Sequence, residues 1–312
     1  MKRRFIASSV MVGVAVLHLS AAGQTARPVG AIERVAVISV DGMRPDVLLR
    51  AQAPNMRKLM ANGSFTFWAR STEVSVTLPS HVSMLTGVPP EKHGITFNTD
   101  PPLDKEVYPA CPTIFELAKK AGYSTALISG KSKFSVLAKP GTVDWAYIPA
   151  RGKAAGDPDI ARAAAAIVAE HRPQLLFVHF ASNDAVGHSK GWGSAEQIAG
   201  MEGADEAVGV VLDAIEKAGL TDSTLILLTA DHGGAGKSHG RDDPRSRHIP
   251  WIAAGPGVVR NFDLTQYPAL TVNIEDTFAT ACYFLGIEPG NVDGKPVLQI
   301  RKTEELPVKK AA

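Results

Sequence analysis

Apolar runs that alternate with amphipathic helical patterns are the feature that most constrains the fold of this chain. Four short runs, at 34–40, 124–129, 174–180 and 224–230, are rich in β-branched and apolar residues and have the length of buried parallel strands. Helical patterns occur at 45–60, 112–121, 157–172, 194–218 and 275–285. Strands that alternate with helices predict a parallel sheet covered on both faces. The expected fold class is therefore α/β, as a three-layer αβα sandwich with a mostly parallel central sheet.

The length and the net charge of the chain limit the number of domains and the kinds of partner that we expect. Its 312 residues, of which 45% are hydrophobic, can bury a sizeable core, and we expect one catalytic domain over residues 24–312. The 33 Lys and Arg residues nearly balance the 31 Asp and Glu residues, which gives a net charge of +2. This charge provides no strong field for a polyanion, so a nucleic-acid duplex is not expected as a partner. The oligomeric state stays open.

The first 23 residues have the layout of a signal peptide. Basic residues within 1–4 precede an apolar run at 5–19, and small residues follow at 20–23. The alternative is a membrane anchor, but the run is shorter than the about 20 residues needed to span a bilayer, and His18 interrupts it. We therefore expect a signal peptide at 1–23, no stable membrane span, and export to the periplasm or secretion.

Two cysteines, Cys111 and Cys282, are far apart in the sequence. An oxidising compartment would permit a disulfide between them. Two separately buried thiols that pack as small apolar side chains are at least as good an interpretation, and both stay open.

Acidic and imidazole side chains gather at the ends of three predicted strands. Asp41 follows the first strand, Asp184 and His188 follow the third, and Asp231 and His232 follow the fourth. A single Asp after a strand is most often a cap or a turn residue. Because ligands of such sheets bind outside the carboxyl ends of the strands, three acidic strand ends together predict a metal site. Mixed oxygen and nitrogen ligands suit zinc or manganese better than calcium or magnesium.

A hydroxyl group lies between the first two acidic positions, at Thr77. Pro79 suits the start of a helix, so Thr77 is expected just before a helix N-terminus, where the dipole and the free N–H groups favour a phosphate. The simpler interpretation is that Thr77 only caps this helix. A metal ion beside Thr77 would lower the pKa of the hydroxyl and make it a nucleophile.

Four segments together resemble the alkaline phosphatase superfamily and, within it, the type I phosphodiesterase and nucleotide pyrophosphatase family. They are V-I-S-V-D-G-M-R-P-D at 37–46, T-L-P-S-H at the start of 77–98, N-D-A-V-G-H at 183–188 and A-D-H-G-G at 230–234. The sulfatase branch has an Arg after the Pro of the second segment, and this chain lacks it, so sulfate esters are not expected as the main substrate. The resemblance implies an alkaline phosphatase-like fold that holds two divalent metal ions, zinc in the family.

The resemblance also implies which residues bind the two ions. For the ion that activates the nucleophile, the matching residues are Asp41, Thr77, Asp231 and His232. For the other ion, Asp184 and His188 match two ligands, and the third is expected to be His239 or His248. His239 is favoured because it is followed by Gly, with Gly255-Pro256 downstream as in the family, whereas His248 resembles the corresponding His of the phosphosugar mutases.

Further residues match groups that bind the substrate. Asn98 corresponds to the asparagine that donates a hydrogen bond to a non-bridging phosphate oxygen, although it could simply be a turn residue. Lys131 and Lys133 could reach an anionic part of the substrate, as lysines do in the related phosphonoacetate hydrolases, or could be solvated loop residues.

The expected activity is hydrolysis of a small-molecule phosphoester, as a phosphodiesterase that forms a covalent phosphothreonine on Thr77. A phosphomonoesterase or phosphonate hydrolase of the same superfamily is the first alternative. An exported metal-binding protein without catalysis is the second, and the complete set of expected ligands argues against it.

Overall fold

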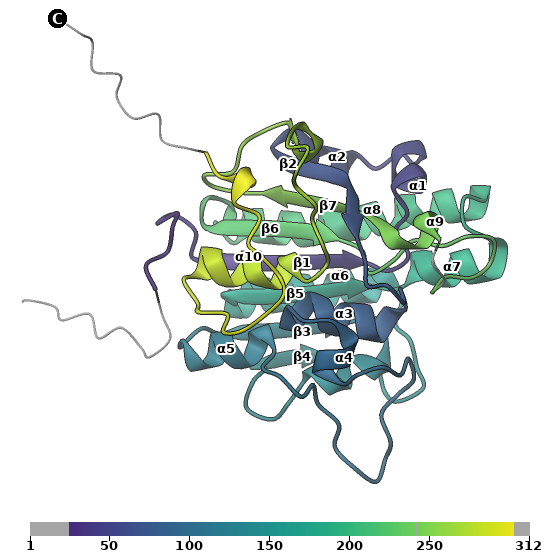
Figure 1. Cartoon of the computed structure of the whole chain (residues 1–312), viewed down its shortest axis with the longest axis horizontal. Coiled ribbons are helices and arrows are strands. Elements are labelled where there is room, and N and C mark those ends of the chain that lie inside the picture. Colours follow the sequence, from purple (N-terminus) through teal and green to yellow (C-terminus); the bar gives the residue numbers. More distant parts are fainter. Residues whose placement is uncertain (1–24, 241–242, 303–312) are drawn as a thin grey trace, which may run out of the picture.

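The computed structural model describes residues 25–240 and 243–302, so the expected signal peptide lies outside the described residues. The described chain builds one eight-stranded sheet in the order β4-β3-β5-β1-β6-β7-β2-β8 (Figure 1). The strands are β1 (Arg34–Val40), β2 (Gly63–Arg70), β3 (Thr125–Ser129), β4 (Trp145–Tyr147), β5 (Leu175–Phe180), β6 (Thr224–Thr229), β7 (His248–Ala254) and β8 (Phe262–Asp263). The four predicted strands are β1, β3, β5 and β6, and they pair in parallel around β1, as expected.

One half of the sheet departs from the parallel pattern. β7 runs antiparallel to both of its neighbours, β6 and β2. The sequence analysis did not predict β2, β7, β4 or β8, and Pro250 within β7 explains part of this, since proline cannot donate to a strand ladder. Opposite Pro250, the register of β2 shifts between Thr66 and Ala69, so that β2 holds one extra residue in a bulge.

Helices cover both faces of the sheet (Figure 1). On one face, α6 and α8 pack against each other, and α1, α2 and α7 contact α8. On the other face, α10 packs against α3, and α3 contacts α4, with α5 beside β3. Their bounds are α1 (Pro45–Arg50), α2 (Pro54–Ala61), α3 (Thr77–Thr86), α4 (Pro90–His93), α5 (Ile114–Lys120), α6 (Asp157–His171), α7 (Ser182–Lys190), α8 (Ala195–Lys217), α9 (Pro244–Arg247) and α10 (Asp276–Leu285). The expected three-layer αβα arrangement is confirmed.

The helix expected at 45–60 is in fact two helices. α1 ends at an extended Ala51, and α2 begins at Pro54. Proline disfavours helical backbone in the residue before it and has no N–H for the hydrogen bond that would continue the helix. The helix is therefore interrupted before Pro54. The capping box of α5, formed by Thr113 and Glu116, is present.

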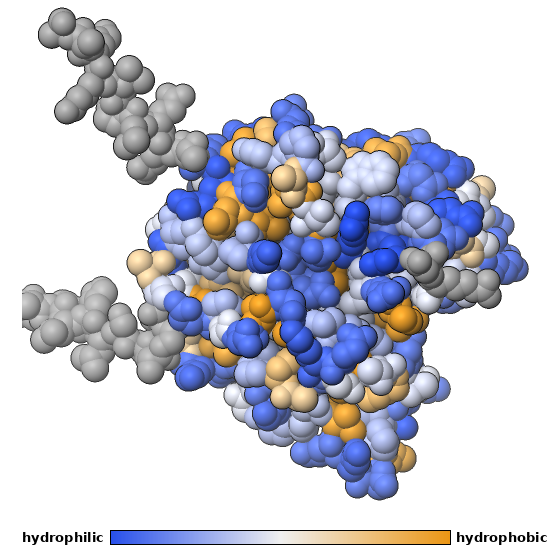
Figure 2. Space-filling view, in the orientation of Figure 1, coloured by the Kyte–Doolittle hydropathy of each residue, from blue (hydrophilic) through white to orange (hydrophobic). Residues whose placement is uncertain are grey.

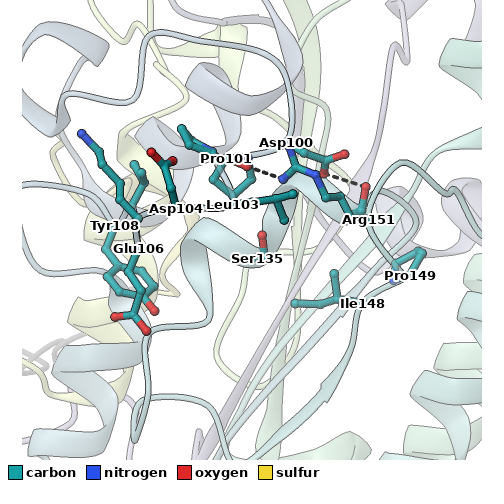
Figure 3. A pocket seen from close by; sticks show the side chains of 14 residues that line it. Asp100, Pro101, Leu103, Asp104, Glu106, Tyr108, Ser135, Ile148, Pro149 and Arg151 are labelled. Carbon is teal, nitrogen blue, oxygen red and sulfur yellow. Dashed lines mark hydrogen bonds between the residues drawn. The ribbon is translucent and has the colours of Figure 1, made fainter.

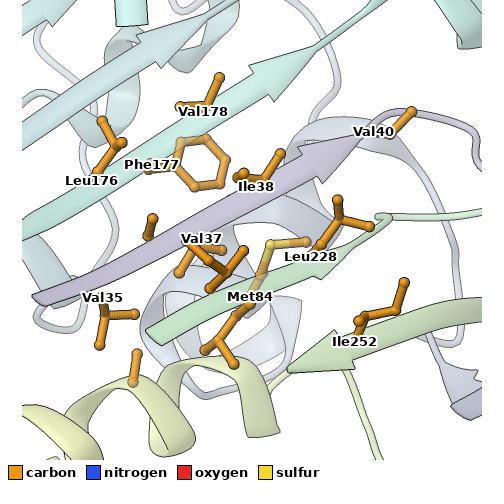
Figure 4. Packing of buried hydrophobic residues seen from close by; sticks show 14 of the residues in the cluster. Val35, Val37, Ile38, Val40, Met84, Leu176, Phe177, Val178, Leu228 and Ile252 are labelled. Atoms are coloured by element: carbon orange, nitrogen blue, oxygen red, sulfur yellow. The ribbon is translucent and has the colours of Figure 1, made fainter. Parts of the chain in front are cut away.

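The core lies between the central strands and the helices. Val37 and Ile38 of β1, Val178 of β5 and Leu228 of β6 are almost fully buried, and Met84 of α3 packs near them (Figure 4). Each such side chain contributes about 1.5 to 3 kcal/mol through its burial. The central strands are therefore a rigid support for the residues that follow them.

The two cysteines are free thiols, so the structure shows no disulfide between them. Cys282 is fully buried in α10, and Cys111 is half-buried in the loop before α5. Among the described residues, no helix is both long and apolar enough to cross a membrane.

Asp205 joins α8 to the start of α2 and gives a test of the fold. Its buried carboxylate accepts hydrogen bonds from the backbone N–H groups of Asn55 at 3.1 Å and Met56 at 2.8 Å. Because Asp205→Ala leaves these helix N-terminal donors unsatisfied, we expect a loss of about 2 to 3 kcal/mol in the free energy of unfolding, measured by urea denaturation. The exposed Asp213 on the same helix is the control, and equal losses for Asp205→Ala and Asp213→Ala would contradict this role.

Candidate active site

Three carboxylates converge at the carboxyl ends of the central parallel strands. Asp41 directly follows β1, Asp231 follows β6 after one residue, and Asp184 lies in the first turn of α7 just after β5. Asp41 and Asp231 are completely buried, and Asp184 is 4% exposed. The backbone N–H of Gly42 donates to Asp231 Oδ1 at 3.1 Å and so ties the ends of β1 and β6 together.

Six side chains form two groups that could each hold a metal ion. Within each group the potential ligand atoms all lie within 4.8 Å of one another, and the groups are Asp41, Asp231 and His232, and Asp184, His188 and His239. In the first, His232 Nε2 lies 3.1 Å from Asp231 Oδ2 and 3.4 Å from Asp41 Oδ1. In the second, His188 Nε2 lies 3.3 Å from Asp184 Oδ1 and 3.1 Å from His239 Nε2. The rings of His232 and His239 stack at 3.6 Å, which places the two groups side by side.

Hydrogen bonding in these groups fits metal binding. One buried oxygen of each carboxylate, Asp41 Oδ1, Asp184 Oδ1 and Asp231 Oδ2, accepts no hydrogen bond from the described residues. Buried carboxylate oxygens without partners are costly, and they are acceptors suited to a divalent cation. The residues present therefore fit two metal ions, one in each group.

The charge of the three carboxylates is only partly matched by protein cations. Burial alone would raise the pKa of Asp41, but the Lys131 ammonium and nearby imidazoles outweigh it and hold the pKa well below its usual range. Burial and the neighbouring carboxylates raise the pKa of Asp231 well above its usual range. For Asp184, burial and Asp41 act in the same upward direction, yet the nearby His188 imidazole and the Lys131 charge lower the pKa to about 2. Divalent cations would relieve this repulsion.

Lys131 lies between the two groups rather than out in the loop. Its Nζ donates to Asp41 Oδ2 at 2.7 Å and to Asp184 Oδ2 at 2.6 Å. Burial would lower the pKa of this ammonium, but the two carboxylates raise it above its usual value. The structure thus pairs Lys131 with two carboxylates, whereas the sequence analysis offered a contact with the substrate or a solvated position in a loop.

Thr77 is the first residue of α3, and its hydroxyl is buried beside the first group. Thr77 Oγ1 lies 3.4 Å from His232 Nε2. The N-cap of α3 is Val76, whose own side chain makes no capping hydrogen bond, so the interpretation of Thr77 as the N-cap is wrong. The sequence suggested that the helix starts at Pro79, but it begins two residues earlier, at Thr77. The Thr77 hydroxyl therefore lies at a helix N-terminus, as expected, and is free for another role.

Asn98 is anchored at the same helix end. Its Oδ1 accepts a hydrogen bond from the backbone N–H of Leu78 at 2.9 Å and another from Lys133 Nζ at 2.8 Å. These bonds orient the amide so that its nitrogen remains to donate. Burial and the nearby charge of Lys131 lower the pKa of Lys133 to about 8. Asn98 and Lys133 thus form a polar cluster at the start of α3.

Two buried histidines support the site, and the sequence analysis gave them no role. His179 Nε2 hydrogen-bonds to Asp41 Oδ2 at 2.9 Å. His81 Nδ1 hydrogen-bonds to the carbonyl of Thr77 at 2.8 Å, while its Nε2 contacts Ser39 Oγ at 2.7 Å. The sequence did contain a signal, because the polar residues Ser39 and His179 interrupt two apolar runs that were predicted as strands. In the structure the two residues are register partners on β1 and β5.

His248 lies apart from both groups. It begins β7, its Nδ1 donates to the carbonyl of Pro244 at 3.0 Å, and its ring contacts Trp68 edge-on at 5.0 Å. The structure therefore brings His239, and not His248, to Asp184 and His188.

A hollow of about 470 Å³ opens beside the loop that follows Asn98 in the sequence. The loop from Asp100 to Tyr108 forms one wall, and Ile148 to Arg151 form another (Figure 3). The Arg151 guanidinium donates to the carbonyl of Pro101 and holds the walls together. Ser132, between the two lysines in the sequence, and Ser135 also line it.

Comparisons with known proteins agree with this geometry. Residues 35–242 match the sequence model of a family described as type I phosphodiesterase / nucleotide pyrophosphatase. An uncharacterized pyrophosphatase/phosphodiesterase of Schizosaccharomyces pombe is 27% identical over 222 residues, which are 66% of this chain and 46% of that protein. Ectonucleotide pyrophosphatase/phosphodiesterase family member 3 of Mus musculus is 26% identical over 272 residues, 79% of this chain and 29% of that protein. The chain thus spans less than half the length of these curated relatives.

Solved structures share the fold. Murine ectonucleotide pyrophosphatase/phosphodiesterase 5 superposes with a TM-score of 0.71 at 16% identity, covering 86% of this chain and 100% of that one. A 2-O glycosaminoglycan sulfatase superposes with a TM-score of 0.69 at 14% identity, covering 86% of this chain and 74% of that one. Because the family match extends over well more than half of the residues, the chain belongs to the type I phosphodiesterase / nucleotide pyrophosphatase family.

Proposed function

We propose that the protein is a zinc-dependent phosphodiesterase that cleaves small phosphodiesters through a covalent phosphothreonine on Thr77. The observation that carries this proposal is the Thr77 hydroxyl at the N-terminus of α3, 3.4 Å from His232 in the first candidate metal group. A helix N-terminus favours a phosphate, and a nucleophile beside a metal group is in position to attack it. The family match supports a phosphodiesterase-type hydrolase.

Each proposed metal ion has its own set of ligands. Asp41, Thr77, Asp231 and His232 would hold one ion, and Asp184, His188 and His239 would hold the other. When bound, the ions would lower the pKa of the Thr77 hydroxyl and neutralise charge on the phosphate and the leaving oxygen. Mixed carboxylate and imidazole ligands favour zinc.

Other side chains would attack the phosphate, orient the nucleophile and bind the substrate. Thr77 Oγ1 forms a bond to phosphorus while the bond to the leaving oxygen breaks in line, and water then hydrolyses the phosphothreonine. His81 holds the Thr77 carbonyl and so orients the nucleophile. The Asn98 amide nitrogen donates to a non-bridging oxygen, where negative charge accumulates. Lys131 lies where it would also approach a phosphate that contacts both groups. The hollow lined by the loop from Asp100 to Tyr108 would give room for an organic part of the substrate.

Lys131 and Lys133 favour a second candidate, a phosphomonoesterase or phosphonate hydrolase. Both ammonium groups lie near the site, and a monoester carries one more negative charge than a diester. We further propose export to the periplasm or secretion, because residues 1–23 have the layout of a signal peptide.

Hydrolysis of two matched aryl esters tests the proposed activity. The zinc-loaded protein should release p-nitrophenol faster from bis-p-nitrophenyl phosphate than from p-nitrophenyl phosphate, followed by absorbance. Chelation should abolish release because the carboxylate-imidazole groups then hold no ions, and added zinc should restore it. Faster release from the monoester would instead support a phosphomonoesterase. No release from either ester would contradict both esterase activities and would leave a phosphonate hydrolase or a metal-binding protein without catalysis.

Thr77→Ala tests the nucleophile. We expect kcat to fall by at least about 10⁴-fold, since the substitution removes the attacking oxygen, while Thr77→Ser keeps an oxygen and retains measurable turnover. Zinc content and thermal unfolding should change little in either variant. Turnover of Thr77→Ala close to that of the unchanged protein would show that another group attacks phosphorus.

His239 and His248 provide a matched pair for the metal site. His239→Ala should lower the zinc content from about two ions per chain to about one, because it removes a ligand of the second group. His248→Ala should leave the content unchanged. Elemental analysis of both purified variants measures this, and the reverse result would assign the third ligand to His248.

A further inference from the structure

The second candidate metal group, Asp184, His188 and His239, contains one exposed ligand. The side chain of His188 is 45% exposed, whereas the side chains of the other five candidate ligands are at most 7% exposed. His188 lies near the end of α7, and its Nδ1 donates to the carbonyl of Lys237 at 3.1 Å. An imidazole that is this exposed needs further contacts if it is to face an ion at a fixed position.

The indole of Trp192 lies against both histidines of this group. Its ring centroid is 5.1 Å from that of His188, with the two rings nearly perpendicular at 85°, and 5.8 Å from that of His239. Trp192 itself is only 7% exposed. The surface around α7 and α9 is mostly hydrophilic (Figure 2), so this indole is not part of an exposed apolar patch. One buried ring therefore limits the movement of two candidate ligands.

The indole is in turn anchored on the backbone after β1. Its Nε1–H donates to the carbonyl of Gly42 at 3.0 Å, and Gly42 directly follows the candidate ligand Asp41. The backbone N–H of Trp192 donates to the carbonyl of Gly236 at 2.7 Å. The position of the indole is therefore set by backbone groups on two other segments of the site.

Two glycines leave the space that the indole occupies. A Cβ on Gly187, which directly precedes His188, would lie 2.8 Å from the indole, too close for two carbon atoms. A Cβ on Gly234 would overlap with the same ring even more. Glycine inside a helix is less favourable than alanine, so Gly187 within α7 has a reason in packing. The absence of side chains at both positions is matched to the indole.

We propose that Trp192 is a positioning residue of the second metal group. Its indole holds the rings of His188 and His239 so that both face one ion together with Asp184. The inference rests on the proposed function, because it needs an ion in this group. The first group does not need such a support, since its carboxylates follow strand ends and its side chains are completely buried.

Zinc titration of the metal-free protein against a chromophoric chelator tests the proposal. Trp192→Phe keeps an aromatic ring but removes the N–H donor and part of the indole. We expect zinc to bind the second group about 10- to 100-fold more weakly, because groups that orient metal ligands have effects of this size. Binding to the first group should stay within about threefold. Comparison with His239→Ala identifies which group has weakened.

Trp251→Phe is the matched control for this variant. Trp251 is also buried, and its indole N–H donates to Thr277 of α10 at 3.1 Å rather than to a group beside a candidate ligand. The substitution therefore removes a similar buried ring and donor. Zinc should bind both groups of Trp251→Phe within about threefold of the unchanged protein.

Gly187→Ala tests the same contact from the helix. Alanine favours the helix, yet its methyl group must displace the indole, so zinc should bind the second group at least about tenfold more weakly. Gly203→Ala is the control, because Gly203 also lies within a helix and a Cβ there would meet no further atom within 4 Å. In the Trp192→Phe background, Gly187→Ala should cause a smaller loss than it does alone, because both substitutions act through one ring.

The unchanged protein separates this inference from the proposed function. If it binds two zinc ions and both Trp192→Phe and Gly187→Ala bind them with the same affinity, the inference is overturned and the proposed function stands. Equal weakening at both groups, or the same weakening in Trp251→Phe, would indicate a general loss of structure and would also overturn the inference. If the unchanged protein binds no zinc, the proposed function and the inference both fail.

Discussion

Three buried carboxylates lie together at the carboxyl ends of the central strands. The repulsion among them is the constraint on which the rest of the site depends. Asp41, Asp184 and Asp231 are held there by strand ends that the core fixes, so they cannot separate. Desolvated like charges are costly unless cations match them. Lys131 supplies one cation, and the two groups of carboxylates and imidazoles can hold more. The same positive charge favours a phosphate beside the start of α3.

The centre of the fold could be predicted from sequence, but its antiparallel side could not. The runs at β1, β3, β5 and β6 are continuous and apolar because helices cover both of their faces, and such runs are recognisable without a structure. β7 contains Pro250, which argues against a central strand, and the bulge in β2 that accommodates it depends on register between distant segments. The break between α1 and α2 was missed although Pro54 signals it.

Part of the candidate site could likewise be predicted from the sequence, and part could not. Asp41, Asp184 and Asp231 were predicted to come together because each follows a parallel strand, and the structure places them together. His239 follows no predicted strand, so only the family resemblance pointed to it. The contact of Lys131 with two carboxylates and the surroundings of Trp68 arise from folding of loops and from an antiparallel pair. No local pattern in the sequence encodes such contacts.

The position of β1 in the sheet has a consequence for how the molecule assembles. β1 is the first strand in the chain, yet its neighbours on either side are β5 and β6. Both backbone edges of β1 stay unpaired until the chain as far as Thr229 takes part in folding. Such long-range pairing is slow and leaves a strand exposed to aggregation. Asp41 meets Asp184 and Asp231 only when these strands join. Metal-binding competence therefore arises late, at the step that completes the centre of the sheet.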